Sequence, residues 1–224
     1  MGPEINWEGF IMGVFKRAFA FILTAAMLIS AAGCSKTKRV FSISTVENIL
    51  ISRNAYKYNE ITGFTRAVLS PSEVEGKPVY MSSEGMDAQS LYNVIVNHSM
   101  SFPAAEVTAA LYSCFWQNDP SGTPTDTTVY VLHFSDEKTA DKIYRAIDQK
   151  LVQGWANARY ASGKDGYQYS TVVIDVSGGQ SERGVYLSRN SVVFVRGFCD
   201  EKIDNALIAT VCDKLGVVTP VDAK

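Results

Sequence analysis

Two short motifs carry residue types that could catalyse acyl transfer. Ser135 precedes Lys138 by three positions, so on a helix the hydroxyl and the amine would lie on one face. A serine in that setting acts as a nucleophile when the lysine takes its proton. Ser188 and Asn190 form a second polar motif later in the chain. The two acidic residues between Ser135 and Lys138, however, equally suit the cap and first turn of a helix.

The order of these motifs resembles that in penicillin-binding proteins and β-lactamases, where S-x-x-K and S-x-N are followed by K-T-G. No K-T-G follows Asn190. Helix capping therefore explains Ser135 and Lys138 better, and the sequence predicts no catalytic residue. His98 falls at the end of an expected helix and His133 in an expected strand, and no Cys/His spacing suits a metal. We accordingly expect no metal site and no cofactor.

Aromatic residues gather in the stretch 153–169, which has the composition of a loop. Trp155, Tyr160 and Tyr167 stand there among basic residues. Aromatic rings on a loop stack on sugars or anchor a protein partner. The same rings can also cover the end of a sheet. These three residues are the candidate ligand-binding residues, and both interpretations stay open.

A hydrophobic segment near the N-terminus has the order of a secretory signal peptide. Lys16 and Arg17 precede an apolar run, and small residues follow it. The run is about 15 residues long, shorter than the roughly 20 that a membrane-spanning helix needs. Acidic residues before Met12 are atypical of such peptides, so we interpret Met12 as the start of translation. Residues 1–33 are the predicted signal peptide.

Cys34 follows the small residues Ala31-Ala32-Gly33. This stretch resembles the lipobox of bacterial lipoproteins, although that family prefers Leu at the position of Ala31. The resemblance covers residues 12–35 and implies that Cys34 receives a diacylglycerol and becomes the new N-terminus. The protein would then be anchored in the cell membrane by lipid, facing outside the cytoplasm. The alternative is cleavage by ordinary signal peptidase, which would leave Cys34 as a plain thiol.

Composition limits the classes of partner. The net charge of −2 argues against nucleic-acid binding, which normally needs a basic surface. The mature chain is also loosely similar to small Gram-positive lipoproteins of unknown function, a likeness that brings no known activity. We expect a non-catalytic module of the cell envelope that binds a protein, peptide or glycan. The alternative is a cell-envelope hydrolase whose active site the sequence does not reveal.

Three cysteines remain if Cys34 is acylated, namely Cys114, Cys199 and Cys212. An odd number leaves at least one free thiol or an intermolecular bridge. A helix would hold Cys199 and Cys212 roughly 20 Å apart, too far for a disulfide. Cys114 could pair with either of them, but we favour three buried thiols.

The pattern of apolar residues predicts a single α+β domain over 44–224, after a lipidated cysteine and tether over 34–43. We expect an antiparallel sheet with helices packed on one face. Segment 129–151 aligns without gaps on 193–215, which suggests a strand–helix pseudo-repeat. Helices are expected near 45–53 after a capping box at Ser44 and Glu47, near 88–98, at 135–153, and at 200–216 with Gly216 as C-cap. Strands are expected at 106–116, 127–134 and 167–176, and on both sides of Arg189-Asn190. A turn is expected at 177–184, and 54–86 receives no assignment.

Overall fold

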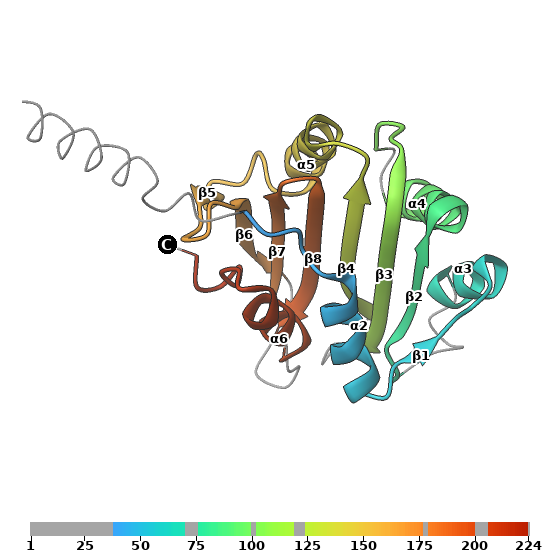
Figure 1. Cartoon of the computed structure of the whole chain (residues 1–224). Coiled ribbons are helices and arrows are strands. Elements are labelled where there is room, and N and C mark those ends of the chain that lie inside the picture. The colour runs from blue at the N-terminus through green and yellow to red at the C-terminus, as the bar shows by residue number, and fades with distance from the viewer. Residues whose placement is uncertain are drawn as a thin grey trace, which may run out of the picture. The chain divides into compact units, whose positions relative to one another are not determined.

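Within the described residues, eight strands form one sheet in the order β1-β2-β3-β4-β8-β7-β6-β5 (Figure 1). Only β1 and β2 are parallel neighbours there, and all other pairs are antiparallel. The computed structural model describes residues 38–69, 76–99, 102–118, 124–176, 179–199 and 206–223. The elements are α2 (Ile43–Ser52), β1 (Tyr56–Lys57), α3 (Ile61–Leu69), β2 (Val79–Glu84), α4 (Gly85–Ser99), β3 (Val107–Asn118), β4 (Pro124–Phe134), α5 (Glu137–Leu151), β5 (Arg159–Ser162), β6 (Gln168–Val176), β7 (Gly179–Ser188), β8 (Ser191–Cys199) and α6 (Ala206–Leu215).

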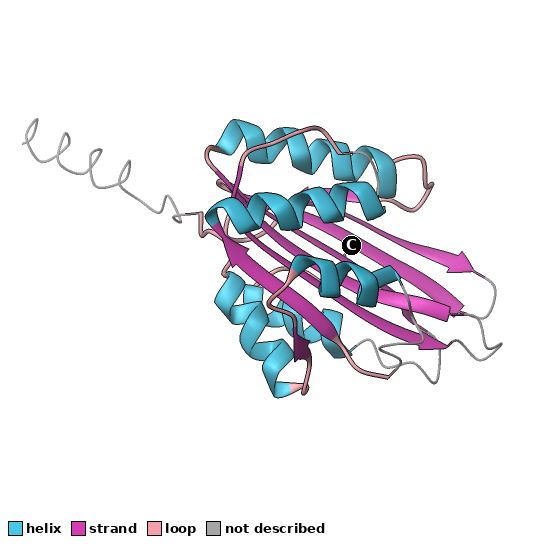
Figure 2. Cartoon of the chain, turned by 90° about the vertical axis from the view of Figure 1, so that its right-hand side faces the viewer, coloured by secondary structure: helices cyan, strands magenta, loops and turns pink. Residues whose placement is uncertain are grey.

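Helices cover both faces of this sheet (Figures 1 and 2). Helices α3, α4 and α5 pack on one face, called the α5 face, and α2 and α6 pack on the other, called the α6 face. Each face has its own apolar core, because successive side chains of a strand point to opposite sides. On β8, Val192 and Phe194 join the core of the α5 face, and Val193 and Val195 join that of the α6 face.

The predicted α+β class and antiparallel sheet are confirmed, but the helices do not lie on one face only. The central strands are apolar on both sides, as the run Val192 to Val195 shows, so both sides must be shielded from water. Both units of the proposed pseudo-repeat exist as a strand followed by a helix. Their helices nevertheless pack on opposite faces, since α5 and α6 belong to different cores. The similarity therefore reflects a shared strand-and-helix pattern rather than equivalent positions.

Helix α2 begins two residues before the predicted capping box. Its N-cap is Ser42, whose Oγ accepts a hydrogen bond from the Thr45 amide at 3.1 Å. Glu47 does not cap the helix, because its Oε1 accepts hydrogen bonds from Lys57 at 2.6 Å and Ser82 at 3.0 Å. The carboxylate thus connects α2 to the first two strands instead.

Three other local predictions have clear outcomes. Helix α5 is capped by Asp136, whose Oδ1 accepts from the Thr139 amide at 2.8 Å, as the acidic first turn indicates. Gly216 ends α6 with a φ of 69°, a conformation that favours glycine. The turn predicted at 177–184 is wrong over its described part, because β7 begins at Gly179 and pairs with both β6 and β8. The predicted start of the last helix at 200–205 lies outside the described residues.

The stretch 54–86, which the sequence left unassigned, contains β1, α3 and β2. Helix α3 buries Phe64, Ala67 and Val68, whose three- and four-residue spacing is helical. Gly63 within the helix, and Pro71, Gly76 and Pro78 after it, hide that short period in the sequence.

The two described free thiols lie on opposite sides of the sheet. Cys114 belongs to the core of the α5 face and Cys212 to that of the α6 face, and both are buried. The sheet between them prevents the Cys114–Cys212 pairing that the sequence left open. Burial raises the pKa of both thiols, to about 12 for Cys212, which keeps them protonated. The side chain of Cys199 lies outside the described ones.

Glu182 is an acidic side chain within the sheet, on β7, with 2% of its surface exposed. Burial raises the pKa of Glu182 to about 7, and the negative charge of Asp222 adds to the rise. The unfolded chain would release this proton near the ordinary value of 4.5. The difference in proton affinity corresponds to about 3 kcal/mol.

The free energy of unfolding should therefore fall as pH rises from about 4.5 to about 7, because only the unfolded chain loses the Glu182 proton in that range. Glu182→Gln should remove this slope, gaining up to about 3 kcal/mol over the parent protein between the two pH values. Urea unfolding at a series of pH values between these two measures the free energy of unfolding of both proteins. Glu60→Gln, at an exposed position, controls for the loss of one carboxylate. If the free energy of unfolding fell equally with pH in Glu182→Gln and in the parent protein, Glu182 would not be the group responsible.

Candidate functional site

A groove of about 640 Å³ runs between α5 and the β5–β6 hairpin, at the edge of the sheet. Helix α5 supplies one wall through both buried and exposed side chains, and the hairpin supplies the other. The groove is lined by Tyr144, Arg145, Asp148, Gln149, Gln153, Tyr160, Ala161, Ser162, Gln168 and Tyr169.

Asp148 is the buried charged group of this groove, with 6% of its surface exposed. Its Oδ2 accepts a hydrogen bond from Gln153 Nε2 at 3.0 Å, whereas Oδ1 has no partner among the described residues. A buried carboxylate oxygen without a donor costs free energy. A ligand that donates a hydrogen bond to Oδ1 would remove that cost.

Two tyrosines border the carboxylate. Tyr144 lies one helical turn before Asp148, and its hydroxyl is 3.1 Å from Ser170 Oγ on β6. This hydrogen bond fixes α5 against the hairpin. Tyr160 approaches from β5 with 53% of its surface exposed. Burial raises the pKa of the Tyr160 hydroxyl, and the charge of Asp148 raises it further, which places the two groups near each other.

The groove offers one carboxylate, one exposed aromatic ring and three amide side chains, Gln149, Gln153 and Gln168. Arg145 stands at its rim, where its Nε donates to Asp141 Oδ2 at 2.8 Å. Amides and a carboxylate exchange hydrogen bonds with hydroxyl groups, and an aromatic face stacks on an apolar sugar face. The chemistry of the lining therefore suits a neutral polyhydroxyl ligand.

The structure separates the three aromatic residues predicted to bind ligand. Tyr160 lines the groove. Trp155 is 45% exposed in the turn after α5 and is not among the residues that line the groove. Tyr167 is 8% exposed in the core of the α6 face, where its hydroxyl accepts from the Val218 amide at 2.9 Å. Residues 159–162 and 168–169 are strand, so the stretch is a hairpin rather than one loop.

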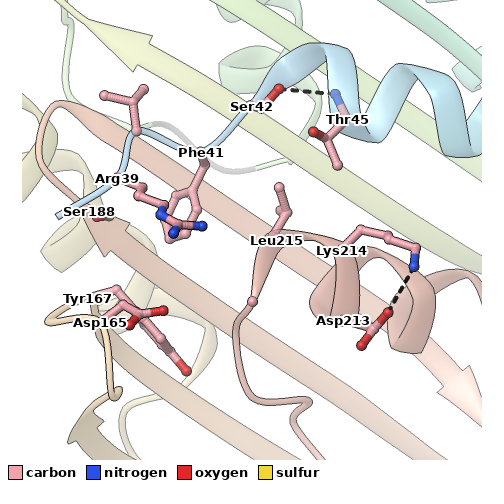
Figure 3. Close-up of a pocket in the computed structure, with 12 residues that line it drawn as sticks. Arg39, Phe41, Ser42, Thr45, Asp165, Tyr167, Ser188, Asp213, Lys214 and Leu215 are labelled. Atoms are coloured by element: carbon pink, nitrogen blue, oxygen red, sulfur yellow. Dashed lines mark hydrogen bonds and ion pairs between the residues drawn. The ribbon is translucent and has the colours of Figure 1, made fainter. Parts of the chain in front are cut away.

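Tyr167 lines a second pocket, of about 360 Å³, on the α6 face (Figure 3). Phe41 forms part of its wall and is 5% exposed, with its ring edge-on to Tyr167. The backbone of Phe41 is held as well, because its amide donates to Ser191 Oγ at 2.9 Å and its carbonyl lies 2.6 Å from His133 Nε2. The chain before α2 is thus bound to the sheet from Phe41 onward, within the region predicted to be tether.

The residues of the two serine motifs have structural roles. Ser135 and Lys138 are exposed, and Ser135 Oγ donates to the capping Asp136. Asn190 forms the turn between β7 and β8, and its side-chain amide donates to the Phe134 carbonyl at 2.7 Å. Helix capping and turn formation account for these contacts.

His133 is occupied by its contact with Phe41, and the side chain of His98 lies outside the described ones. In the described ranges, no group of three or more His, Cys, Asp or Glu side chains could hold a metal ion. None of the helices that the structure describes is long and apolar enough to cross a membrane.

Sequence reasoning missed Asp148 and the three glutamines. A signal for Asp148 exists, since it follows the buried Ile147 and lies four residues after Tyr144 on the same helical face. The glutamines carry no comparable signal, because exposed amides are common on helices and strands. Only the approach of the hairpin to α5 gives them a shared surface.

The different burial of the aromatic residues predicts different effects on stability. Tyr167→Ala should lower the free energy of unfolding by about 3 kcal/mol, because it empties a packed site and removes the hydrogen bond to Val218. Trp155→Ala and Tyr160→Ala should each change it by less than about 0.5 kcal/mol. Urea unfolding of the three variants compares them. A large loss for Trp155→Ala would instead place that ring in the core.

Comparison with known proteins gives no relative. No known protein family, no curated protein and no solved structure matches the chain.

Proposed function

We propose that this chain is a lipid-anchored protein of the cell envelope, held outside the cytoplasm by acyl chains on Cys34. We further propose that its domain binds a neutral glycan in the groove between α5 and the β5–β6 hairpin. The observation that carries the binding proposal is the buried Asp148 carboxylate near the exposed ring of Tyr160; its Oδ1 accepts no hydrogen bond from any described residue. The anchor is inferred from the signal-peptide and lipobox pattern.

The position of the domain in the chain supports the anchor. One compact unit spans Lys38–Lys224, so it begins four residues after Cys34. In the sequence, acylation of Cys34 would therefore modify a residue that precedes this unit. Two or three acyl chains give stable membrane attachment, whereas one chain gives only marginal binding.

The groove favours a sugar through the combination of its groups. Asp148 can accept hydrogen bonds from hydroxyls, and the glutamine amides both donate and accept. Oδ1 of Asp148 has almost no exposed surface, so a neighbouring side chain must move before a ligand reaches it; Gln149 and Tyr160 are exposed residues of the same groove. Exposed side chains change rotamer readily, on the picosecond to nanosecond timescale.

Hydrolysis of a glycan is the alternative function. Glycosidases normally use two carboxyl groups on either side of the scissile bond. Asp148 is the one carboxylate among the described residues that line the groove. Binding without cleavage is therefore the function that we propose.

Cys34→Ala should abolish metabolic labelling with radioactive palmitate, because the thiol that receives the lipid is gone. The variant should accumulate as an uncleaved precursor or be released from the membrane. Cys114→Ala is the control and should be labelled like the parent protein, since Cys114 is buried in the core. Normal labelling of Cys34→Ala would refute the anchor.

Isothermal titration calorimetry with tetra-N-acetylchitotetraose, a neutral probe, should detect binding by the mature protein. Asp148→Asn should weaken binding about 10-fold or more, as expected for loss of a charged hydrogen bond. Tyr160→Ala should weaken it to a similar degree by removing the stacking ring. Melting temperatures of both variants should be measured in parallel, so that a folding defect is recognised.

Tyr56→Ala and Asp175→Asn are the matched controls, because these residues are exposed and lie outside the groove. Both should bind the probe like the parent protein. Unchanged binding by Asp148→Asn and Tyr160→Ala would move the site elsewhere, and no binding of the probe by the parent would count against a chitooligosaccharide-like ligand. Release of shorter sugars during the titration would favour the hydrolase.

A further inference from the structure

Basic side chains surround the point where the N-terminal segment meets the domain. Arg39 and Lys214 line the pocket beside Phe41 (Figure 3). Lys164 lines a second cavity, which shares Tyr167 with that pocket. Lys38 packs close to Gly166 in the same hairpin loop, 3.5 Å from where a Cβ there would lie. All four basic side chains are exposed. These residues, Lys38, Arg39, Lys164 and Lys214, are called the basic patch.

The charge of the basic patch differs in sign from that of the whole chain. The patch residues carry four positive charges, and the neighbouring Asp165 and Asp213 carry two negative charges, which leaves +2 against −2 for the protein. Lys214 Nζ lies 3.3 Å from Asp213 Oδ2, but both side chains are well exposed, so the pair is weakly held. A positive surface on an otherwise acidic protein attracts anionic partners.

The tether limits which face can approach the membrane. Seven peptide steps separate Cys34 from Phe41, so this length of chain reaches at most roughly 25 Å. A domain of this size has a radius of gyration of roughly 16 Å. Because Phe41 is fixed to the sheet by its ring and its backbone, the surface around it stays within one domain's width of the anchored cysteine.

We propose that the basic patch rests on anionic phospholipid head groups of the membrane that carries the anchor; this inference rests on the proposed lipidation of Cys34. Lysine and arginine near an anionic leaflet are attracted to it, and the attraction is screened within a Debye length. Val40, an apolar side chain with 39% of its surface exposed, lies between Arg39 and Phe41 and would enter the head-group boundary. The domain would therefore sit on the membrane with a fixed face rather than move freely on its tether.

The test uses the mature, lipidated protein in vesicles of phosphatidylcholine, with or without phosphatidylglycerol, that contain a nitroxide-labelled quencher lipid. A fluorescent amino acid replaces either Lys164, which leaves Lys38, Arg39 and Lys214 to hold the patch on the membrane, or Glu60 near the opposite edge of the sheet. Quenching at position 164 should be at least about twofold stronger than at position 60 in the anionic vesicles. The difference should shrink in about 1 M salt, where the Debye length is about 3 Å.

Charge reversal tests the residues directly. Lys38→Glu combined with Lys214→Glu should reduce quenching at position 164 to the level at position 60. The matched control, Lys138→Glu combined with Lys142→Glu, reverses two exposed charges on α5 and should leave quenching unchanged. Equal quenching at both positions, or no effect of reversing the patch charges, would overturn the proposed membrane contact of the patch. Neither result would overturn the lipid anchor.

Flotation of the same vesicles separates the two proposals. Protein that stays with the vesicles in high salt is anchored by lipid, so equal quenching would then refute only the fixed orientation. Protein that leaves the vesicles in high salt would overturn the lipid anchor, and the orientation with it.

Discussion

The fold depends on one constraint, namely that the central strands are apolar on both faces. On β4, Val129 and Val131 face α2 and α6, whereas Tyr130 and Leu132 face the other three helices. A sheet of this kind is stable in water only when both faces are covered. The two helical layers, and the docking of Phe41 into the second of them, follow from that requirement.

The same requirement explains where binding chemistry is found. Most side chains in the middle of the sheet are used for the two cores, whereas polar side chains line a groove where a helix reaches the edge of the sheet. Helix α5 meets the β5–β6 hairpin there, and Tyr144 bonds to Ser170 across the contact. Asp148, one turn further along, is buried at the groove, and its Oδ1 has no donor in the described part of the chain. A groove next to a rigid contact is better suited to recognition than a loop would be.

Much of the secondary structure could be predicted from the sequence, because strong local signals mark it. The periodicity of α5, its acidic cap and the glycine after α6 all agree with the structure. The predictions failed where a distant contact competes with a local one. Glu47 accepts hydrogen bonds from Lys57 and Ser82 instead of capping its own helix. Gly179 begins a strand rather than lying in a turn, because β7 pairs with both β6 and β8. Of the three predicted binding residues, only Tyr160 reaches the groove.

By itself the sequence determined the α+β class and the order of most strands and helices, and it contains the pattern at Cys34 from which an anchor is inferred. Each of these features depends only on residues that are adjacent or that recur with a short period. Tertiary structure alone decided which face each helix covers, that Tyr167 is core whereas Tyr160 is surface, and that Asp148 meets the hairpin. The physical reason is that these facts depend on pairing between segments far apart in the chain. A local pattern fixes that a side chain is apolar or charged, but only the packed neighbours fix whether it is covered.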